Sequence, residues 1–94
     1  MSEANIRRGQ DANRILAEPV LKEALAQMYR DITDQWGQVP VRDVEGREHC
    51  WRLFKSMEKF EALLKSYVES GKADEAMLKR QQTPLEVVKG AIGL

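Results

Sequence analysis

The chain lacks most of the residues that would give a protein of 94 residues an obvious chemistry. It has one cysteine, Cys50, which excludes an internal disulfide, and one histidine, His49. A zinc site needs three or four ligands, and no further Cys or His is present to complete one. The sequence also has no glycine-rich phosphate loop and no nucleophile motif. We therefore predict a non-enzymatic protein with no catalytic residue, no metal ligand and no cofactor.

Long apolar runs and charge of one sign are also missing. No segment approaches the ~20 apolar residues that a membrane-spanning helix needs, and the first residues lack the apolar core of a signal peptide. The 15 basic and 15 acidic residues are interspersed, so no basic block can neutralise phosphates. These features predict a cytoplasmic protein with no membrane contact, and they disfavour nucleic acid as a partner.

The strongest positive signal is an apolar pattern in residues 43–70. From Cys50 to Tyr67, apolar side chains follow one another at alternating steps of three and four, as on one face of a long helix. Gly71 is expected to end this helix. At ~1.5 Å per residue the helix is roughly 42 Å long, whereas a compact chain of this length is only roughly 32 Å across. The pattern therefore predicts an elongated or self-assembled molecule.

The apolar arc of this helix is wider than a single neighbouring helix can cover. It spreads over about 180° in helical projection. We therefore expect a homo-oligomer and define a candidate self-association seam. The seam consists of Leu53, Phe54, Met57, Phe60, Leu64, Tyr67 and Val68.

Two further helices are predicted before the long one, at about 2–17 and 19–36. Pro19 separates them, because proline disfavours helical geometry in the preceding residue and suits a first helical turn. Gly37 is expected to cap the second helix, and Asp43 the third. The short connection between the second and third helices favours antiparallel packing.

The remaining segment, residues 73–94, is interpreted as a docking tail attached to a hairpin domain at 1–72. Thr83, Pro84 and Glu86 have the spacing of a capping box that opens a short helix at about 84–92. So short a helix is marginal alone in water and must dock on something. Its expected docking side chains are Leu85, Val88 and Ile92. The predicted fold is all-α, an elongated antiparallel helical hairpin with short N- and C-terminal helices, assembled into an oligomeric bundle.

A candidate interaction surface lies where the second and third helices meet. It consists of Arg42, Arg47, Glu48 and Trp51. Charged groups at a tight corner form either a structural ion-pair cluster or a recognition site. Trp51 points away from the seam, and either packs under the first helix or anchors a partner, as tryptophan and arginine often do at interfaces. The sequence leaves both choices open.

The same region carries a resemblance. The run Pro40-Val41-Arg42-Asp43-Val44-Glu45-Gly46-Arg47-Glu48, followed by Trp51, resembles a group of small uncharacterised all-helical proteins encoded in tailed-bacteriophage genomes, near capsid and packaging genes. The segments Arg14-Ile15-Leu16-Ala17-Glu18-Pro19 and Glu69-Ser70-Gly71-Lys72 extend the resemblance over residues 10–75. The resemblance implies a phage setting but no established activity.

The expected function is therefore a non-enzymatic phage accessory or assembly protein, a helical oligomer that binds another phage or host protein. Its expected location is the host-cell cytosol or the virion. An alternative is an inhibitor of host defence, which binds a host protein or sequesters a small nucleotide signal. A small terminase subunit is less favoured, because the charge is balanced and no helix-turn-helix pattern is present.

Overall fold

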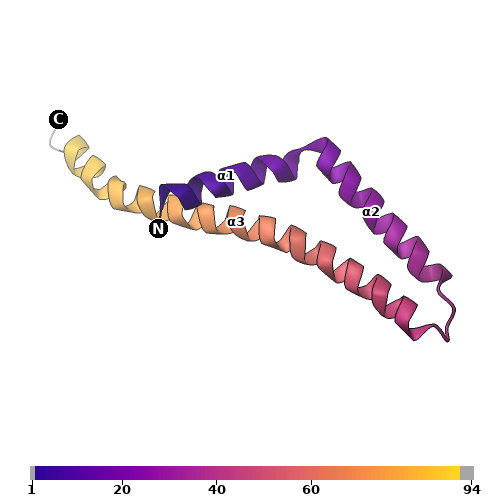
Figure 1. Cartoon of the computed structure of the whole chain (residues 1–94). Helices are drawn as coiled ribbons and strands as arrows, with labels where there is room; N and C mark the ends of the chain where they lie inside the picture. The colour runs from indigo at the N-terminus through magenta and orange to yellow at the C-terminus, as the bar shows by residue number, and fades with distance from the viewer. Residues whose placement is uncertain (1, 92–94) are drawn as a thin grey trace.

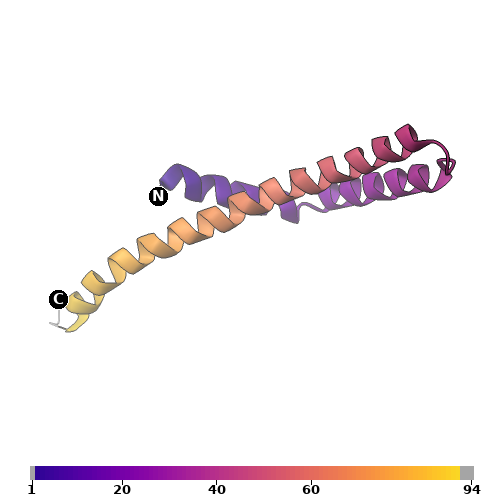
Figure 2. The ribbon, with the colours of Figure 1, turned by 90° about the horizontal axis from the view of Figure 1, so that it is seen from below.

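A computed structural model describes residues 2–91, with side chains described for residues 2–81. The chain forms α1 (Glu3–Ala17), α2 (Pro19–Gln38) and α3 (Val44–Ala91), and residues 2–91 contain no strand. The all-α prediction is confirmed. Helices α1 and α2 follow each other along α3, which runs back in the opposite direction (Figure 1). Seen at right angles, α3 crosses this path obliquely, so that α1 and α2 lie along different sides of it (Figure 2).

The molecule is long and thin. Its principal extents are 76 × 24 × 19 Å and its radius of gyration is 21.5 Å. A compact chain of this length has a radius of gyration of only about 12 Å. Few residues can therefore be enclosed on all sides.

Local sequence signals account for the helix starts. The Ser2 hydroxyl accepts a hydrogen bond from the Asn5 amide at 3.0 Å and caps α1. Pro19 occupies the first turn of α2, as predicted, after an extended Glu18. A carboxylate oxygen of Asp43 accepts from the Gly46 amide at 3.0 Å, which confirms Asp43 as the cap of α3.

Two predicted helix ends are wrong. Helix α2 continues past Gly37 to Gln38, and the extended Val39 ends it, with the Val39 amide donating to the Trp36 carbonyl at 3.2 Å. Helix α3 does not end at residue 70 but continues through Gly71 as a single helix of 48 residues. The backbone also stays helical through Thr83 and Pro84, so the predicted separate helix at 84–92 is part of α3 as far as Ala91.

Gly71 is a packing residue rather than a helix end. It lies against Gly9 of α1, and both glycines are buried. A Cβ atom on Gly9 would lie 2.7 Å from the Tyr67 carbonyl oxygen and 3.0 Å from the Gly71 Cα atom. Because neither residue has a side chain, the two helix backbones touch directly. Ala12, one turn further along α1, is 3% exposed.

Polar contacts fasten the start of α1 to α3 beside the two glycines. The Asn5 side-chain amide donates to Ser70 Oγ at 2.8 Å and to Asp74 Oδ2 at 2.9 Å. The Ser2 backbone amide donates to the same Asp74 oxygen at 3.2 Å. These hydrogen bonds, that of Asn5 first, lower the pKa of the Asp74 carboxyl below its ordinary value. We call Ser2, Asn5, Ser70 and Asp74 the N-terminal clasp.

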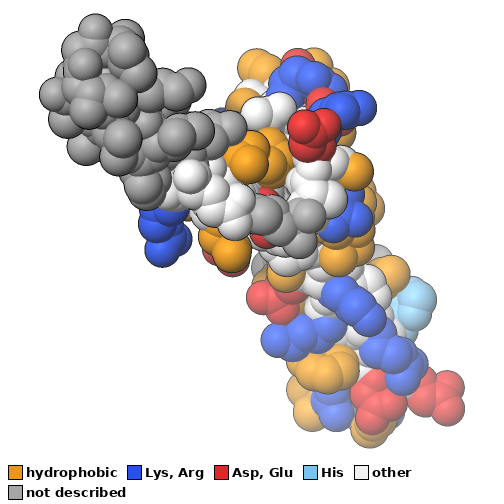
Figure 3. Space-filling model, turned by 90° about the vertical axis from the view of Figure 1, so that its left-hand side faces the viewer, with side chains coloured by type: hydrophobic (Ala, Val, Ile, Leu, Met, Phe, Trp, Pro, Cys, Tyr) orange, Lys and Arg blue, Asp and Glu red, His pale blue; other side chains and the backbone are white. Residues whose placement is uncertain are grey.

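The hydrophobic core is small for the chain. Among residues 2–81, four hydrophobic side chains are buried: Ala12, Ile32, Cys50 and Met57. Many other hydrophobic side chains lie at the surface between charged ones (Figure 3). The accessible surface is 7370 Å², about 1,800 Å² more than the roughly 5,500 Å² expected for a compact protein of 10.8 kDa.

Candidate interaction surfaces

An apolar groove lies between α2 and α3, with a volume of about 450 Å³. Ile32 and Met57 form its buried part. Met28 is 50% exposed and Phe60 49%, so both remain open to solvent. We call this the α2–α3 groove. It is lined by Leu21, Ala24, Leu25, Met28, Ile32, Leu53, Ser56, Met57 and Phe60.

The chain itself covers part of the predicted self-association seam. The Phe54 ring packs edge-on against Tyr29, with 5.4 Å between the ring centroids, and lies 6.3 Å from Trp36. The guanidinium of Arg8 lies over the Tyr67 ring, 4.4 Å from its centroid. These contacts attach α2 and α1 to successive parts of α3.

The remaining seam residues differ in burial, and Met57 is buried in the groove. Leu53 and Phe60 line the α2–α3 groove and remain exposed, whereas Leu64 and Val68 are half-buried. The seam therefore serves two purposes along its length: one set of side chains packs within the chain, and a second set lines an open groove. The self-association of the exposed set stays a prediction.

The predicted corner of Arg42, Arg47, Glu48 and Trp51 is divided in the structure. Arg47 is half-buried, and its guanidinium donates a hydrogen bond to the Val41 carbonyl oxygen within the turn between α2 and α3. Arg42 is exposed in the same turn. Glu48 lies 3.9 Å from Arg52, one helical turn along α3. Three of the four residues thus belong to the turn or to a local ion pair.

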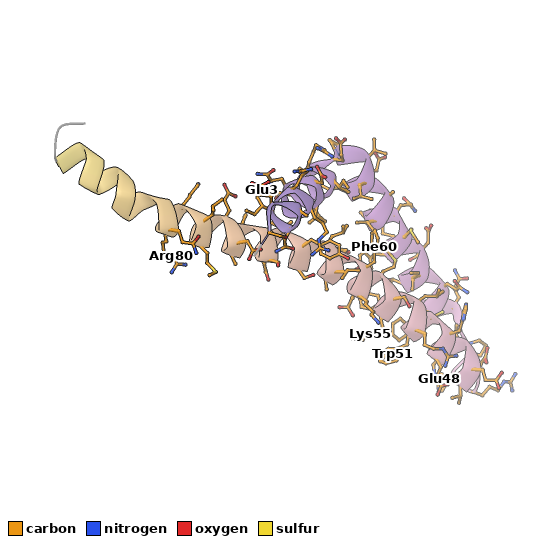
Figure 4. All side chains as sticks on the ribbon, turned by 60° about the vertical axis from the view of Figure 1, so that its left-hand side comes forward. Glu3, Glu48, Trp51, Lys55, Phe60 and Arg80 are labelled. Atoms are coloured by element: carbon orange, nitrogen blue, oxygen red, sulfur yellow. The ribbon has the colours of Figure 1, made fainter. Side chains whose placement is uncertain are left out.

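Trp51 is exposed on the side of α3 opposite the groove. It is 50% exposed, and the Lys55 ammonium lies 5.8 Å from the centroid of its ring. Figure 4 shows Glu48, Trp51 and Lys55 on one side of α3, with Phe60 on the side toward α2. The interpretation that Trp51 packs under the first helix is wrong, because α1 contacts α3 further along, around Tyr67 and Gly71. We call Glu48, Trp51, Arg52 and Lys55 the Trp51 face.

Tyr29 and Glu61 form a polar contact between α2 and α3 that the sequence analysis did not single out. A hydrogen bond with the Glu61 carboxylate, together with burial and the nearby charges of Glu61 and Glu58, raises the pKa of Tyr29 to about 12. The signal in the sequence was the position of Tyr29 on the flank of an apolar stripe in the second helix, formed by Leu21, Leu25, Met28 and Ile32. Its partner was not recognisable, because Glu61 resembles any other surface carboxylate of α3.

The remaining sequence predictions concern metal ligands, a membrane span and the docking tail. His49 is exposed and its neighbour Cys50 is fully buried, so the two side chains do not converge. Within the part of the chain that the structure describes, no group of three or more His, Cys, Asp or Glu residues is placed to hold a metal ion. In the same residues no helix has the length and apolar character to cross a membrane. The predicted docking side chains Leu85, Val88 and Ile92 lie outside the described side chains.

No protein-family model, no curated protein and no solved structure matches this chain.

Proposed function

We propose that this chain is a non-enzymatic binding protein that works as a helical oligomer and presents the Trp51 face to another protein. The observation that carries the proposal is the small core: four buried hydrophobic side chains among residues 2–81, and about 1,800 Å² of surface beyond that of a compact monomer. Hydrophobic burial is the main favourable contribution to folding. A chain with so little of it gains stability from a second molecule.

The Trp51 face supports the binding role. Trp51 exposes half of a large aromatic side chain next to the cationic Lys55 and Arg52, and Glu48 adds an acceptor. Tryptophan and arginine dominate the energetics of protein interfaces, because they offer both apolar area and hydrogen bonds. Trp51 does not line the groove, so its exposed half is available to a partner.

The proposed setting is phage assembly or another accessory role in a phage-infected cell. It rests on the resemblance carried by residues 10–75 and not on the geometry. Affinity purification from infected cells tests the setting: recovery of virion or packaging proteins supports it, and recovery of a host defence protein selects the inhibitor role instead.

The oligomer and the binding face are tested separately. Light scattering on the purified chain at tens of micromolar should give a dimer or larger species, and a monomer would contradict the oligomer. Trp51→Ala should weaken binding to the recovered partner by about 2 kcal/mol or more, as at interface hot spots, and leave the oligomer unchanged. Met77→Ala is the matched control, because Met77 lies on the same helix and is 47% exposed. Equal binding by both variants would place the recognition surface elsewhere.

A further inference from the structure

We propose that a second copy of this chain covers the α2–α3 groove, the two copies packing groove to groove about a two-fold axis. Helices α2 and α3 of both copies then form a four-helix bundle, with Phe60 of each copy entering the groove of the other. This inference rests on the proposed function, and it specifies which surface makes the oligomer.

The amount of exposed surface fits a second copy. A standard protein interface buries about 800 Å² on each partner. The chain as a whole exposes about 1,800 Å² more than a compact monomer of its mass, which exceeds what one such interface covers on a single copy. Three large apolar side chains that line the groove are exposed: Met28, Leu53 and Phe60.

The chemistry of the groove suits self-pairing. None of its nine lining residues carries a charge, and Ser56 is its one polar side chain. In a two-fold interface each patch meets an identical patch, so a charge close to the axis would approach its own copy. A groove lined only by neutral residues avoids that repulsion. Two antiparallel helices with an apolar stripe on one side are also half of a four-helix bundle.

The two-fold arrangement leaves the Trp51 face free. Trp51 lies on the side of α3 opposite Phe60 (Figure 4). A groove-to-groove dimer therefore carries two Trp51 faces on its outer sides and can hold two partner molecules. Dimerisation and partner binding then use different surfaces of the same helix.

Phe60→Asp tests the groove. Each dimer would bury two unpaired carboxylates, so the dissociation constant should rise by at least about a hundredfold. Trp51→Asp is the matched control, because it also replaces an exposed aromatic side chain of α3 by aspartate. Trp51 is 50% exposed and Phe60 is 49% exposed, and the Trp51→Asp chain should remain dimeric. Light scattering over a dilution series measures the dissociation constant of each variant, and far-UV circular dichroism reports its helix content. A Phe60→Asp variant that remains as dimeric as Trp51→Asp overturns the groove as the interface.

A cross-linking experiment answers the question even if Phe60→Asp does not fold. Ser56 lies in the groove, whereas Ser66 lies on α3 outside it; both are exposed and both donate to a backbone carbonyl of their own helix. Ser56→Cys and Ser66→Cys are therefore matched, conservative changes. The unchanged chain gives the background, because Cys50 is fully buried.

With a short bismaleimide, the Ser56→Cys chain should cross-link to a dimer and the Ser66→Cys chain should not. Cross-linking at position 66 alone, or equally at both positions, overturns the groove-to-groove arrangement while the oligomer stands. A monomeric parent chain in light scattering overturns the oligomer and the groove together, so the two failures are distinguishable.

Discussion

The contact between Gly9 and Gly71 makes a prediction that opposes the usual effect of alanine. In an open helix, replacing glycine by alanine stabilises the helix by roughly 1 kcal/mol, because alanine loses less backbone entropy. At Gly9 the new methyl group would lie 2.7 Å from the Tyr67 carbonyl oxygen and 3.0 Å from the Gly71 Cα atom. Both are backbone atoms and cannot move aside as the end of a flexible side chain would. Helix α1 must therefore move away from α3.

The magnitude follows from what this movement disturbs. Overpacking a closely packed contact costs about 1–3 kcal/mol. Separation of the helices also stretches the clasp hydrogen bonds from Asn5 to Ser70 and Asp74, which adds to this cost. The higher helix propensity of alanine offsets part of this cost. We therefore expect Gly9→Ala to destabilise the attachment of α1 by about 1–2 kcal/mol.

Gly37→Ala is the matched control. Gly37 is also helical, and no atom lies within 4 Å of the position of an added Cβ. This change should stabilise the chain by up to about 1 kcal/mol. The two substitutions are chemically identical, so opposite signs isolate the effect of the close helix contact.

Thermal unfolding followed by circular dichroism, together with amide exchange of α1, measures the difference. At one protein concentration Gly9→Ala should melt below the parent chain, by about 4–8 °C per kcal/mol, with faster exchange in residues 3–17. A Gly9→Ala chain that is as stable as Gly37→Ala, with the amides of α1 still protected from exchange, would contradict this expectation. In that case α1 does not pack on α3 through these glycines.

Three further predictions concern single polar groups. Asp43→Ala removes the cap of α3 and should cost about 1 kcal/mol in urea denaturation, whereas Asp43→Asn should cost much less. The pKa of Asp74 is lowered in the folded chain, so its contribution to stability is present above the ordinary value of 3.8 and is lost as the pH falls through the lowered pKa. Asp74→Asn should abolish that part of the acid dependence, and an unchanged acid profile would contradict it. The pKa of Tyr29 is raised to about 12, so its contribution is present below pH 10 and is lost as the pH rises toward 12. The step in tyrosinate absorbance near pH 12 should be missing in Tyr29→Phe, which keeps Tyr67 as its one tyrosine, and Glu61→Gln should move that step back toward pH 10.

Signals confined to a few neighbouring residues were readable in the sequence. The heptad-like spacing from Cys50 to Tyr67 predicted a long helix, and Pro19 predicted the break between α1 and α2. Asp43 was correctly expected to cap α3. Each of these depends on interactions within about one helical turn, so the identity of nearby residues is sufficient.

The role of Gly71 was not readable in the same way. A glycine after a polar residue is typical of a helix end, and local information favours that interpretation. In the folded chain Gly71 meets Gly9, 62 positions earlier, and the absence of side chains on both lets the two helix backbones touch. A pair of glycines on two helices is a recognisable signal only when the helices are known to cross there.

The candidate sites also combine features that depend on nearby residues with features that depend on distant ones. Composition and periodicity were sufficient to predict the helical fold class, the balanced charge and the apolar stripes. The folded arrangement of the helices was needed to show that Arg47 donates within the turn and that α1 leaves Trp51 exposed. The same arrangement determines which part of the apolar seam stays open as a groove, with Phe54 packed against Tyr29 and Phe60 exposed. The physical reason is that burial depends on the direction in which α1 and α2 cross α3, and that direction is set by contacts between residues far apart in the chain.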